Sequence, residues 1–198
     1  YQREDESDGE GFAGALHEDR TSTGRPVYED VDAVAIANYF GGELGIEELA
    51  EHTAQWSVDD AVTYFATGAL PEGTPSSDEF DGGIPGTLER VRVWSEVADG
   101  LGLQLLAYEG GPHFVADRVP EVSALYHEVL EDPRMADLVE QLVSGSQENG
   151  MDRQVLFVTA EPHVAESPWL RFGFVEHGLC DTDDQWRWQG VARFLDAQ

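Results

Sequence analysis

One carboxylate, Glu109, stands at the end of the apolar segment 103–108 and directly before Gly110-Gly111. A short apolar segment bounded by glycines predicts a strand that is buried on both faces, inside a parallel sheet under helices. In parallel α/β folds the catalytic groups lie at the carboxyl ends of the strands, so Glu109 is the first candidate catalytic residue. The competing interpretation is an exposed carboxylate beside a tight turn.

Strands that alternate with helices are expected to position Glu109. Two further apolar segments, 31–40 and 154–160, predict strands like the one that ends at Glu109. Periodicity and capping residues predict helices over 46–52, 57–66, 87–99, 119–130, 133–144 and 186–197, with a possible short helix near 12–17. Because long helical crossovers join parallel neighbours, this order predicts a parallel α/β sheet.

Particular residues predict how the helices begin, end and pack. Ser57 and Asp132 are expected as N-terminal caps, and Gly100 as the residue that ends the helix over 87–99. The terminal helix is expected to turn four apolar residues inward, namely Trp188, Val191, Phe194 and Leu195.

The charge balance limits the partners. The chain has 40 Asp and Glu against 11 basic residues, all of them Arg, for a net charge of −29. Such self-repulsion is tolerable where salt shortens the Debye length to about 3 Å at 1 M, which predicts adaptation to high salt. The Arg residues are scattered and no apolar run is long enough to cross a bilayer, so neither a nucleic-acid nor a membrane partner is expected. We expect an extracellular or cytoplasmic protein of a high-salt organism.

Other chemistries have weaker support. Glu109, His113, Glu161 and His163 are metal-ligand types near predicted strand ends, but no HExxH or paired-cysteine spacing occurs. No metal and no cofactor is therefore expected. The sequence lacks a GxSxG motif for a nucleophilic serine, and the single Cys180 excludes an intrachain disulfide.

Four motifs together resemble a known family. They are Asp32 to Phe40, Ala107-Tyr108-Glu109-Gly110-Gly111, Asp132-Pro133-Arg134-Met135, and Trp169 with Gly173-Phe174-Val175-Glu176-His177. In order and spacing they are similar to the C-terminal part of a family of glycosidase-like TIM-barrel proteins, some of them labelled cellulose-binding. The resemblance implies that residues 31–198 are the C-terminal part, about strands six to eight with their helices, of a (β/α)8 barrel. Residues 1–30 would be a polar lead-in that ends a preceding β/α unit.

The resemblance also implies residue roles. It places Glu109 at the end of strand seven, in the position of the nucleophile, with Asn38-Tyr39 ending strand six and Glu161 ending strand eight. The family's acid/base glutamate ends strand four, which has no counterpart here, so we expect the chain to be incomplete at its N-terminus.

The expected function is that of a salt-adapted glycoside hydrolase-like protein acting on a polysaccharide or glycoside. Tyr39 would hydrogen-bond the Glu109 carboxylate and Trp169 would stack on a sugar face. The candidate substrate-binding residues are Asn38, Tyr39, Tyr108, His113, Glu161 and Trp169.

The same residues allow blander interpretations. Asn38 and Tyr39 could form an ordinary strand-end hydrogen-bonding pair, Trp169 could be a core aromatic, and Glu161 could belong to a solvated turn. Two other functions stay open: a non-catalytic carbohydrate-binding barrel, and a truncated product without a function of its own.

Overall fold

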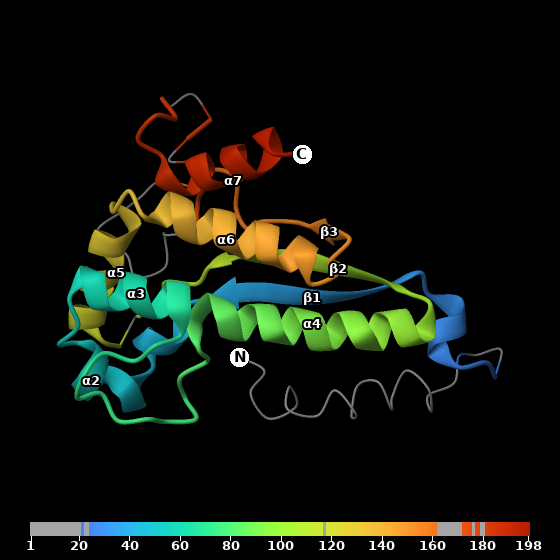
Figure 1. The fold of residues 1–198 in the computed structure, drawn as a ribbon, viewed down its shortest axis with the longest axis horizontal. Coiled ribbons are helices and arrows are strands. Elements are labelled where there is room, and N and C mark those ends of the chain that lie inside the picture. Colours follow the sequence, from blue (N-terminus) through green and yellow to red (C-terminus); the bar gives the residue numbers. More distant parts are fainter. Residues whose placement is uncertain (1–20, 22–23, 117, 162–171, 176, 179–180) are drawn as a thin grey trace.

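The computed structural model describes residues 21, 24–116, 118–161, 172–175, 177–178 and 181–198. Its centre is a three-stranded parallel sheet in the order β1-β2-β3, formed by β1 (Ala33–Phe40), β2 (Gln104–Pro112) and β3 (Arg153–Gln154) (Figure 1). The strands lie side by side in chain order, and helices connect one to the next. The predicted parallel α/β arrangement is thus confirmed.

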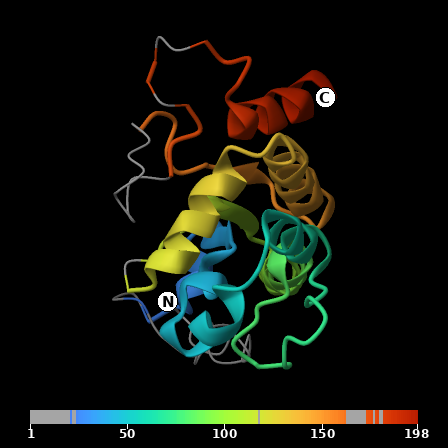
Figure 2. The same cartoon turned by 90° about the vertical axis from the view of Figure 1, so that its left-hand side faces the viewer.

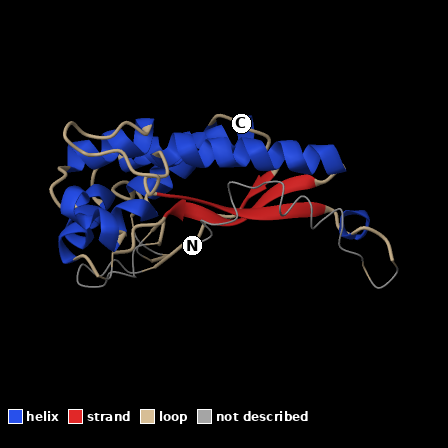
Figure 3. Ribbon diagram, turned by 90° about the horizontal axis from the view of Figure 1, so that it is seen from below, coloured by secondary structure: helices blue, strands red, loops and turns tan. Residues whose placement is uncertain are grey.

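The helices form a layer on one face of the sheet and a group at one end of it. They are η1 (Val27–Asp30), η2 (Gly42–Gly45), η3 (Glu47–Leu49), α2 (Ala50–Thr53), α3 (Val58–Thr67), α4 (Gly83–Leu101), α5 (Pro120–Leu130), α6 (Met135–Glu148) and α7 (Trp186–Asp196). Helices α4 and α6 pack on one face of the sheet, and α7 packs on α6 (Figure 3). Helices α2, α3 and α5 gather beyond the carboxyl end of β1 (Figures 1 and 2).

Two hydrophobic cores hold these layers together. In the larger core, between the helices beyond the strand ends, the ring of Phe114 stacks on Phe65 and Tyr126 with centroid distances of 5.1 and 4.7 Å. The Tyr126 hydroxyl donates to the carbonyl of Gly41, which joins α5 to the end of β1. The smaller core, between α4 and the sheet, contains Val34, Val91, Ala98, Leu103, Leu105, Ala107 and Met151. Each core packs one end of the sheet against helices.

The helix ends agree only in part with the prediction. Ser57 caps α3 as expected, because its hydroxyl accepts from the Asp60 N–H while the Asp60 carboxylate accepts from the Ser57 N–H. The prediction for Gly100 was wrong: α4 continues to Leu101, and Gly102 ends it in the left-handed conformation at φ 71°. A residue without a Cβ reaches that conformation without strain, and Gly102 fills this position.

The third strand is much shorter than predicted. Only Arg153 and Gln154 pair with β2, although the backbone N–H groups of Val155 and Phe157 still donate to β2 carbonyls. Their side chains are 57% and 42% exposed, so the apolar segment 154–160 does not form a buried strand.

The burial predicted for β2 and for the last helix was also wrong in part. Helices pack on one face of β2, and Tyr108 on this strand is 53% exposed. In α7, Arg187 and Gly190 are the buried residues, whereas Leu195 is 57% exposed. A Cβ at Gly190 would lie 2.8 Å from the Cβ of Val139, so the glycine allows α7 to approach α6 closely.

A buried amide joins the sheet to α6. Asn38, 1% exposed, donates through Nδ2 to Ser146 Oγ at 3.1 Å and to Gln154 Oε1 at 3.2 Å. Its side chain crosses β2 at Gly110, where a Cβ would overlap the Asn38 Oδ1 atom. Ser146 lies on α6 and Gln154 on β3, so one side chain connects three elements.

This crossing makes a stability prediction for two glycines. We expect Gly110→Ala to destabilise the protein by about 1–3 kcal/mol, because the added methyl group would displace the Asn38 amide. Gly100→Ala is the matched control: no atom lies within 4 Å of its Cβ position inside α4, so it should stabilise by about 0.5–1 kcal/mol. Denaturant unfolding in molar salt measures both, and equal effects of the two substitutions would contradict the proposed crossing.

Candidate functional site

The side of the sheet on which Glu109 lies is decided by a one-residue register shift. Up to Ile36, which pairs with Ala107, the strands β1 and β2 run in step, but the next residue Ala37 pairs with Glu109. Tyr108 is therefore an extra residue in β2, a bulge of a kind that is rare between parallel strands. Without it, Glu109 would pair with Asn38 and face α6; with it, Glu109 faces away from the helices.

The shift brings Glu109 to the same face as Tyr39. Tyr39 follows Ala37 by two residues on β1, so their side chains share a face. Burial raises the pKa of Tyr39 above its usual range, and the charge of Glu109 and a hydrogen bond with its carboxylate raise it further. The phenol therefore stays protonated and available as a donor to the carboxylate. The pair supplies an oriented carboxylate at the carboxyl end of the sheet.

An aromatic group extends this pair. The ring of His113, which follows β2, lies 5.3 Å from that of Tyr39, and the ring of Phe172 lies 5.7 Å from His113 and 6.3 Å from Tyr39. Phe157 lies 5.5 Å from Phe172 on the far side. Burial lowers the pKa of His113, so its imidazole stays neutral at pH 7. We call Tyr39, Glu109, His113 and Phe172 the strand-end cluster.

Close backbone packing fixes the position of His113. Its backbone N–H donates to the Phe40 carbonyl at 2.9 Å, which continues the pairing of β1 and β2 past Pro112. The imidazole lies directly over Gly42, where a Cβ would overlap its Nδ1 atom. The glycine after β1 is thus required for the histidine after β2.

Glu161 contacts the backbone beside the bridge between Ala160 and Val175. Its Oε2 atom accepts from the backbone N–H of Phe172 at 2.8 Å, and its own N–H donates to the Val175 carbonyl at 3.0 Å. Burial lowers the pKa of Arg187 to about 10, and the charges of Glu131 and Glu161 act in the opposite direction. Arg187 remains charged at pH 7, so Glu161 interacts with a buried cation and a backbone N–H. This arrangement places Phe172 beside His113.

The remaining predicted residues are not all brought together. Asn38 lies on the helix face of the sheet, opposite Tyr39, with its amide directed to Ser146. Tyr108 is exposed and lies near enough to Tyr39 to raise its pKa slightly. Trp169 and His163 lie outside the described residues, as do Cys180 and the predicted helix over 12–17.

A surface hollow lies elsewhere, between the start of α3, the end of α5 and the turn that precedes α6. It is lined by Ser57, Val58, Asp59, His127, Glu128, Glu131, Asp132, Pro133 and Arg134. The Arg134 guanidinium forms ion pairs with Asp59 at 2.7 Å and with Asp132 at 2.6 Å, and these contacts occupy its donors. The prediction of Asp132 as the N-cap was wrong: α6 begins at Met135 with Arg134 as its N-cap, and Asp132 accepts from the Arg134 N–H at 2.9 Å before the helix starts. The hollow shares no residue with the strand-end cluster.

Within the described residues, no group of three or more His, Cys, Asp or Glu side chains is arranged to hold a metal ion. None of the described helices combines the length and hydropathy needed to span a membrane.

Sequence reasoning missed Phe172 and Arg187. Phe172 has no periodic signal, and its place depends on the Glu161 carboxylate, which binds its backbone. Arg187 is 2% exposed although a charged residue is expected on a helix surface. The available signal was its spacing from Gly190, since both residues lie on one face of α7.

Comparisons with known proteins identify no relative of this chain. No family model matches the chain, and no curated protein or solved structure matches it.

The contact between Tyr39 and Glu109 predicts a change in titration. The substitution Glu109→Gln should lower the pKa of Tyr39, because the negative charge beside the phenolate is removed, while burial keeps the value above 10. The tyrosine-ring carbon signals in an alkaline NMR titration measure this. The substitution Glu121→Gln, at an exposed position on α5, should leave the pKa of Tyr39 unchanged. An equal change of this pKa in both variants would contradict the contact between Glu109 and Tyr39.

The packing of His113 predicts a second titration. Phe172→Ala should raise the pKa of His113 toward 6.5, because the imidazole loses part of the cover that disfavours its charged form. Phe157→Ala is the control, since the Phe157 ring contacts Phe172. Its effect on His113 should be smaller. Histidine proton NMR measures both, and an unchanged His113 in Phe172→Ala would contradict the described packing.

Proposed function

We propose that the chain is the C-terminal part of a salt-adapted, glycoside hydrolase-like (β/α)8 barrel protein that acts on a polysaccharide or glycoside, with Glu109 as its nucleophile. The observation that carries this proposal is the register shift, which puts Glu109 and Tyr39 on the side away from the described helices, at the carboxyl end of a parallel sheet. Catalytic groups of parallel β/α folds lie at this end.

The sheet itself supports a barrel assignment. Its strands are parallel and adjacent in chain order, as in consecutive β/α units. Helices pack on one face, and the other face of β1 carries the small side chains of Ala33, Ala35 and Ala37. In a (β/α)8 barrel the helices lie outside and the second face points into the barrel. The proposal places the remaining strands outside these 198 residues.

The strand-end cluster suits the chemistry of a sugar ligand. The Glu109 carboxylate would attack the anomeric carbon, forming a glycosyl ester while the leaving oxygen departs with the electron pair of the broken bond. The Tyr39 hydroxyl would orient the carboxylate, and the rings of His113 and Phe172 would offer apolar surface to a sugar face. A second carboxylate is needed to protonate a poor leaving group.

The second candidate function is a non-catalytic carbohydrate-binding protein. Glu161 favours it, because this carboxylate is engaged by the Phe172 N–H and by the charge of Arg187. Of the described carboxylates, only Glu109 raises the pKa of Tyr39. A cluster with one carboxylate, Glu109, beside an aromatic surface can bind a glycan without cleaving it.

The role of Glu109 can be tested with a substrate whose leaving group needs no protonation by an acid/base residue. A 2,4-dinitrophenyl glycoside has a leaving group that departs without a proton, so its cleavage needs the nucleophile alone. We expect turnover in molar salt with a panel of such glycosides, and a loss of about a thousandfold or more in Glu109→Gln. The 2-fluoro analogues should leave one glycosyl unit on the peptide that contains Glu109, detected by mass spectrometry.

Two comparisons separate the outcomes. Glu121→Gln, at an exposed position on α5, should retain full turnover. Turnover that survives Glu109→Gln would contradict the catalytic assignment. If the wild-type chain is retarded by a soluble polysaccharide in affinity electrophoresis but neither cleaves nor traps any glycoside, the binding protein is the correct assignment.

A further inference from the structure

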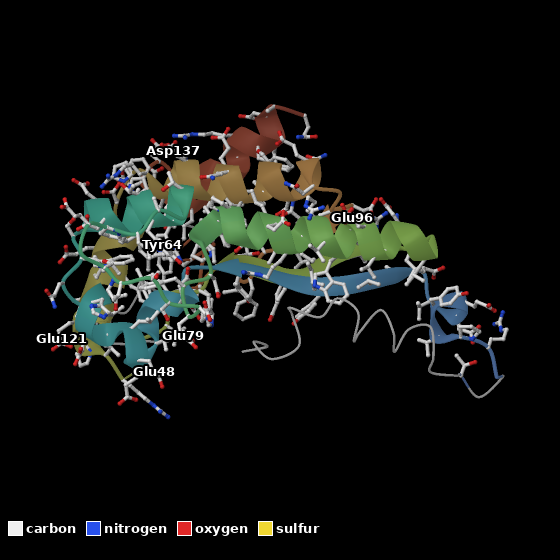
Figure 4. The ribbon with its side chains drawn as sticks, turned by 60° about the horizontal axis from the view of Figure 1, so that its bottom comes forward. Glu48, Tyr64, Glu79, Glu96, Glu121 and Asp137 are labelled. Atoms are coloured by element: carbon white, nitrogen blue, oxygen red, sulfur yellow. The ribbon has the colours of Figure 1, made fainter. Side chains whose placement is uncertain are left out.

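A second carboxyl group, Glu43, is buried behind the strand-end cluster. Glu43 lies on η2, directly after β1, and is 3% exposed. Its Oε1 atom accepts from the Tyr64 hydroxyl of α3 at 2.9 Å. Figure 4 shows Tyr64 in the interior of the helix group, whereas Glu48, Glu121 and Asp137 lie at the periphery. In a chain with 40 acidic residues, Glu43 is held away from water by this packing.

The Tyr64 hydroxyl also contacts the start of α4. It accepts from the Gly82 N–H at 3.0 Å, at the N-cap of that helix. One turn later, the Thr87 hydroxyl donates to the carbonyl of Tyr39 at 3.0 Å. The contacts therefore run from Glu43 through Tyr64 and the first turns of α4 to the strand that carries Tyr39.

The charges around Glu43 come from three elements. The hydrogen bond from the Glu43 backbone N–H lowers the pKa of its carboxyl group, Asp81 before α4 raises it, and the hydrogen bond from Tyr64 on α3 and the charge of Arg90 on α4 lower it. Burial has the largest effect, and the net result is a raised pKa. On α5 the Tyr126 hydroxyl donates to the Gly41 carbonyl, and on α2 the Thr53 hydroxyl donates to the Leu44 carbonyl, so both are directed to the backbone of this turn.

We propose that Glu43 is a proton-dependent connection between the end of β1 and the start of α4: its protonated form is stable in this buried turn, whereas its ionisation buries a charge that the stronger hydrogen bond from Tyr64 does not offset, and so destabilises the Tyr39 end of the sheet. The inference rests on the buried contact of Glu43 with Tyr64 and on the contact of Tyr64 with the helix start. It does not depend on the proposed sugar chemistry.

The sign of the linkage follows from the raised pKa. The folded state binds the Glu43 proton more tightly than the unfolded state, in which a glutamate titrates near 4.5. The stabilisation is complete below that value and is lost as the pH rises through the folded-state pKa. Between pH 4.5 and the folded-state pKa of Glu43, this one group raises the unfolding equilibrium constant by up to about tenfold per pH unit.

The variant Glu43→Gln tests the proposal because an amide keeps the acceptor for Tyr64 but carries no proton linkage. Unfolding in molar salt would be measured at pH values from 4 to 9. We expect the ratio of unfolding constants, wild type over Glu43→Gln, to be constant below about pH 4.5 and to grow by up to about tenfold per unit above it. The control Glu48→Gln, at an exposed position on the neighbouring η3, should give a ratio that does not change with pH.

A direct titration keeps the test decisive if the variant folds poorly. The carboxyl carbon of Glu43, followed by NMR in the wild-type chain, should titrate above 4.5. In Tyr64→Phe it should titrate higher still, because the lost hydrogen bond favours the ionised form. The backbone amide signals of Tyr39 and Thr87 should shift with the same midpoint. A Glu43 carboxyl that titrates near 4.5, or a Glu43→Gln ratio that stays flat with pH, would overturn the proposal.

Discussion

The candidate site depends on a single unpaired residue in β2. Because Ala37 pairs with Glu109 instead of Tyr108, every β2 side chain beyond the shift changes face relative to a regular ladder. The carboxylate then meets Tyr39 on one face, while Gly110 pairs with Asn38 on the other. The geometry of both faces thus follows from one local irregularity.

On the helix face the same shift is held by the Asn38 amide. Gly110 is opposite Asn38, so the side chain can cross β2 and bind both α6 and β3. Slipping β2 by one residue in one direction would bring the Glu109 side chain to the crossing point and separate the buried amide from Ser146 and Gln154, at a cost typical of an unpaired buried polar group. The Asn38 amide therefore favours the observed register of β1 and β2, because this slip would leave it unpaired. A purely apolar contact would not impose this cost.

Local signals in the sequence located most elements but not their exact pairing. Ser57 and Gly-bounded apolar segments predicted α3, β1 and β2, because capping and burial depend on neighbouring residues. The short β3 and the bulge at Tyr108 depend on contacts across the fold, which periodicity does not encode. Glu109 was found from its place at a strand end, whereas Phe172 required the Glu161 carboxylate that holds its backbone.

The net charge of −29 that remains around the surface ion pairs determines which ligands the protein attracts from solution. Arg134 contacts Asp59 and Asp132, and Arg193 contacts Asp137 and Glu140, so each of these cations is matched by two carboxylates. Around them the potential stays negative. Anionic ligands would meet a repulsive field at low ionic strength and would associate faster as salt is added, whereas an uncharged ligand would diffuse in at a rate that salt hardly changes.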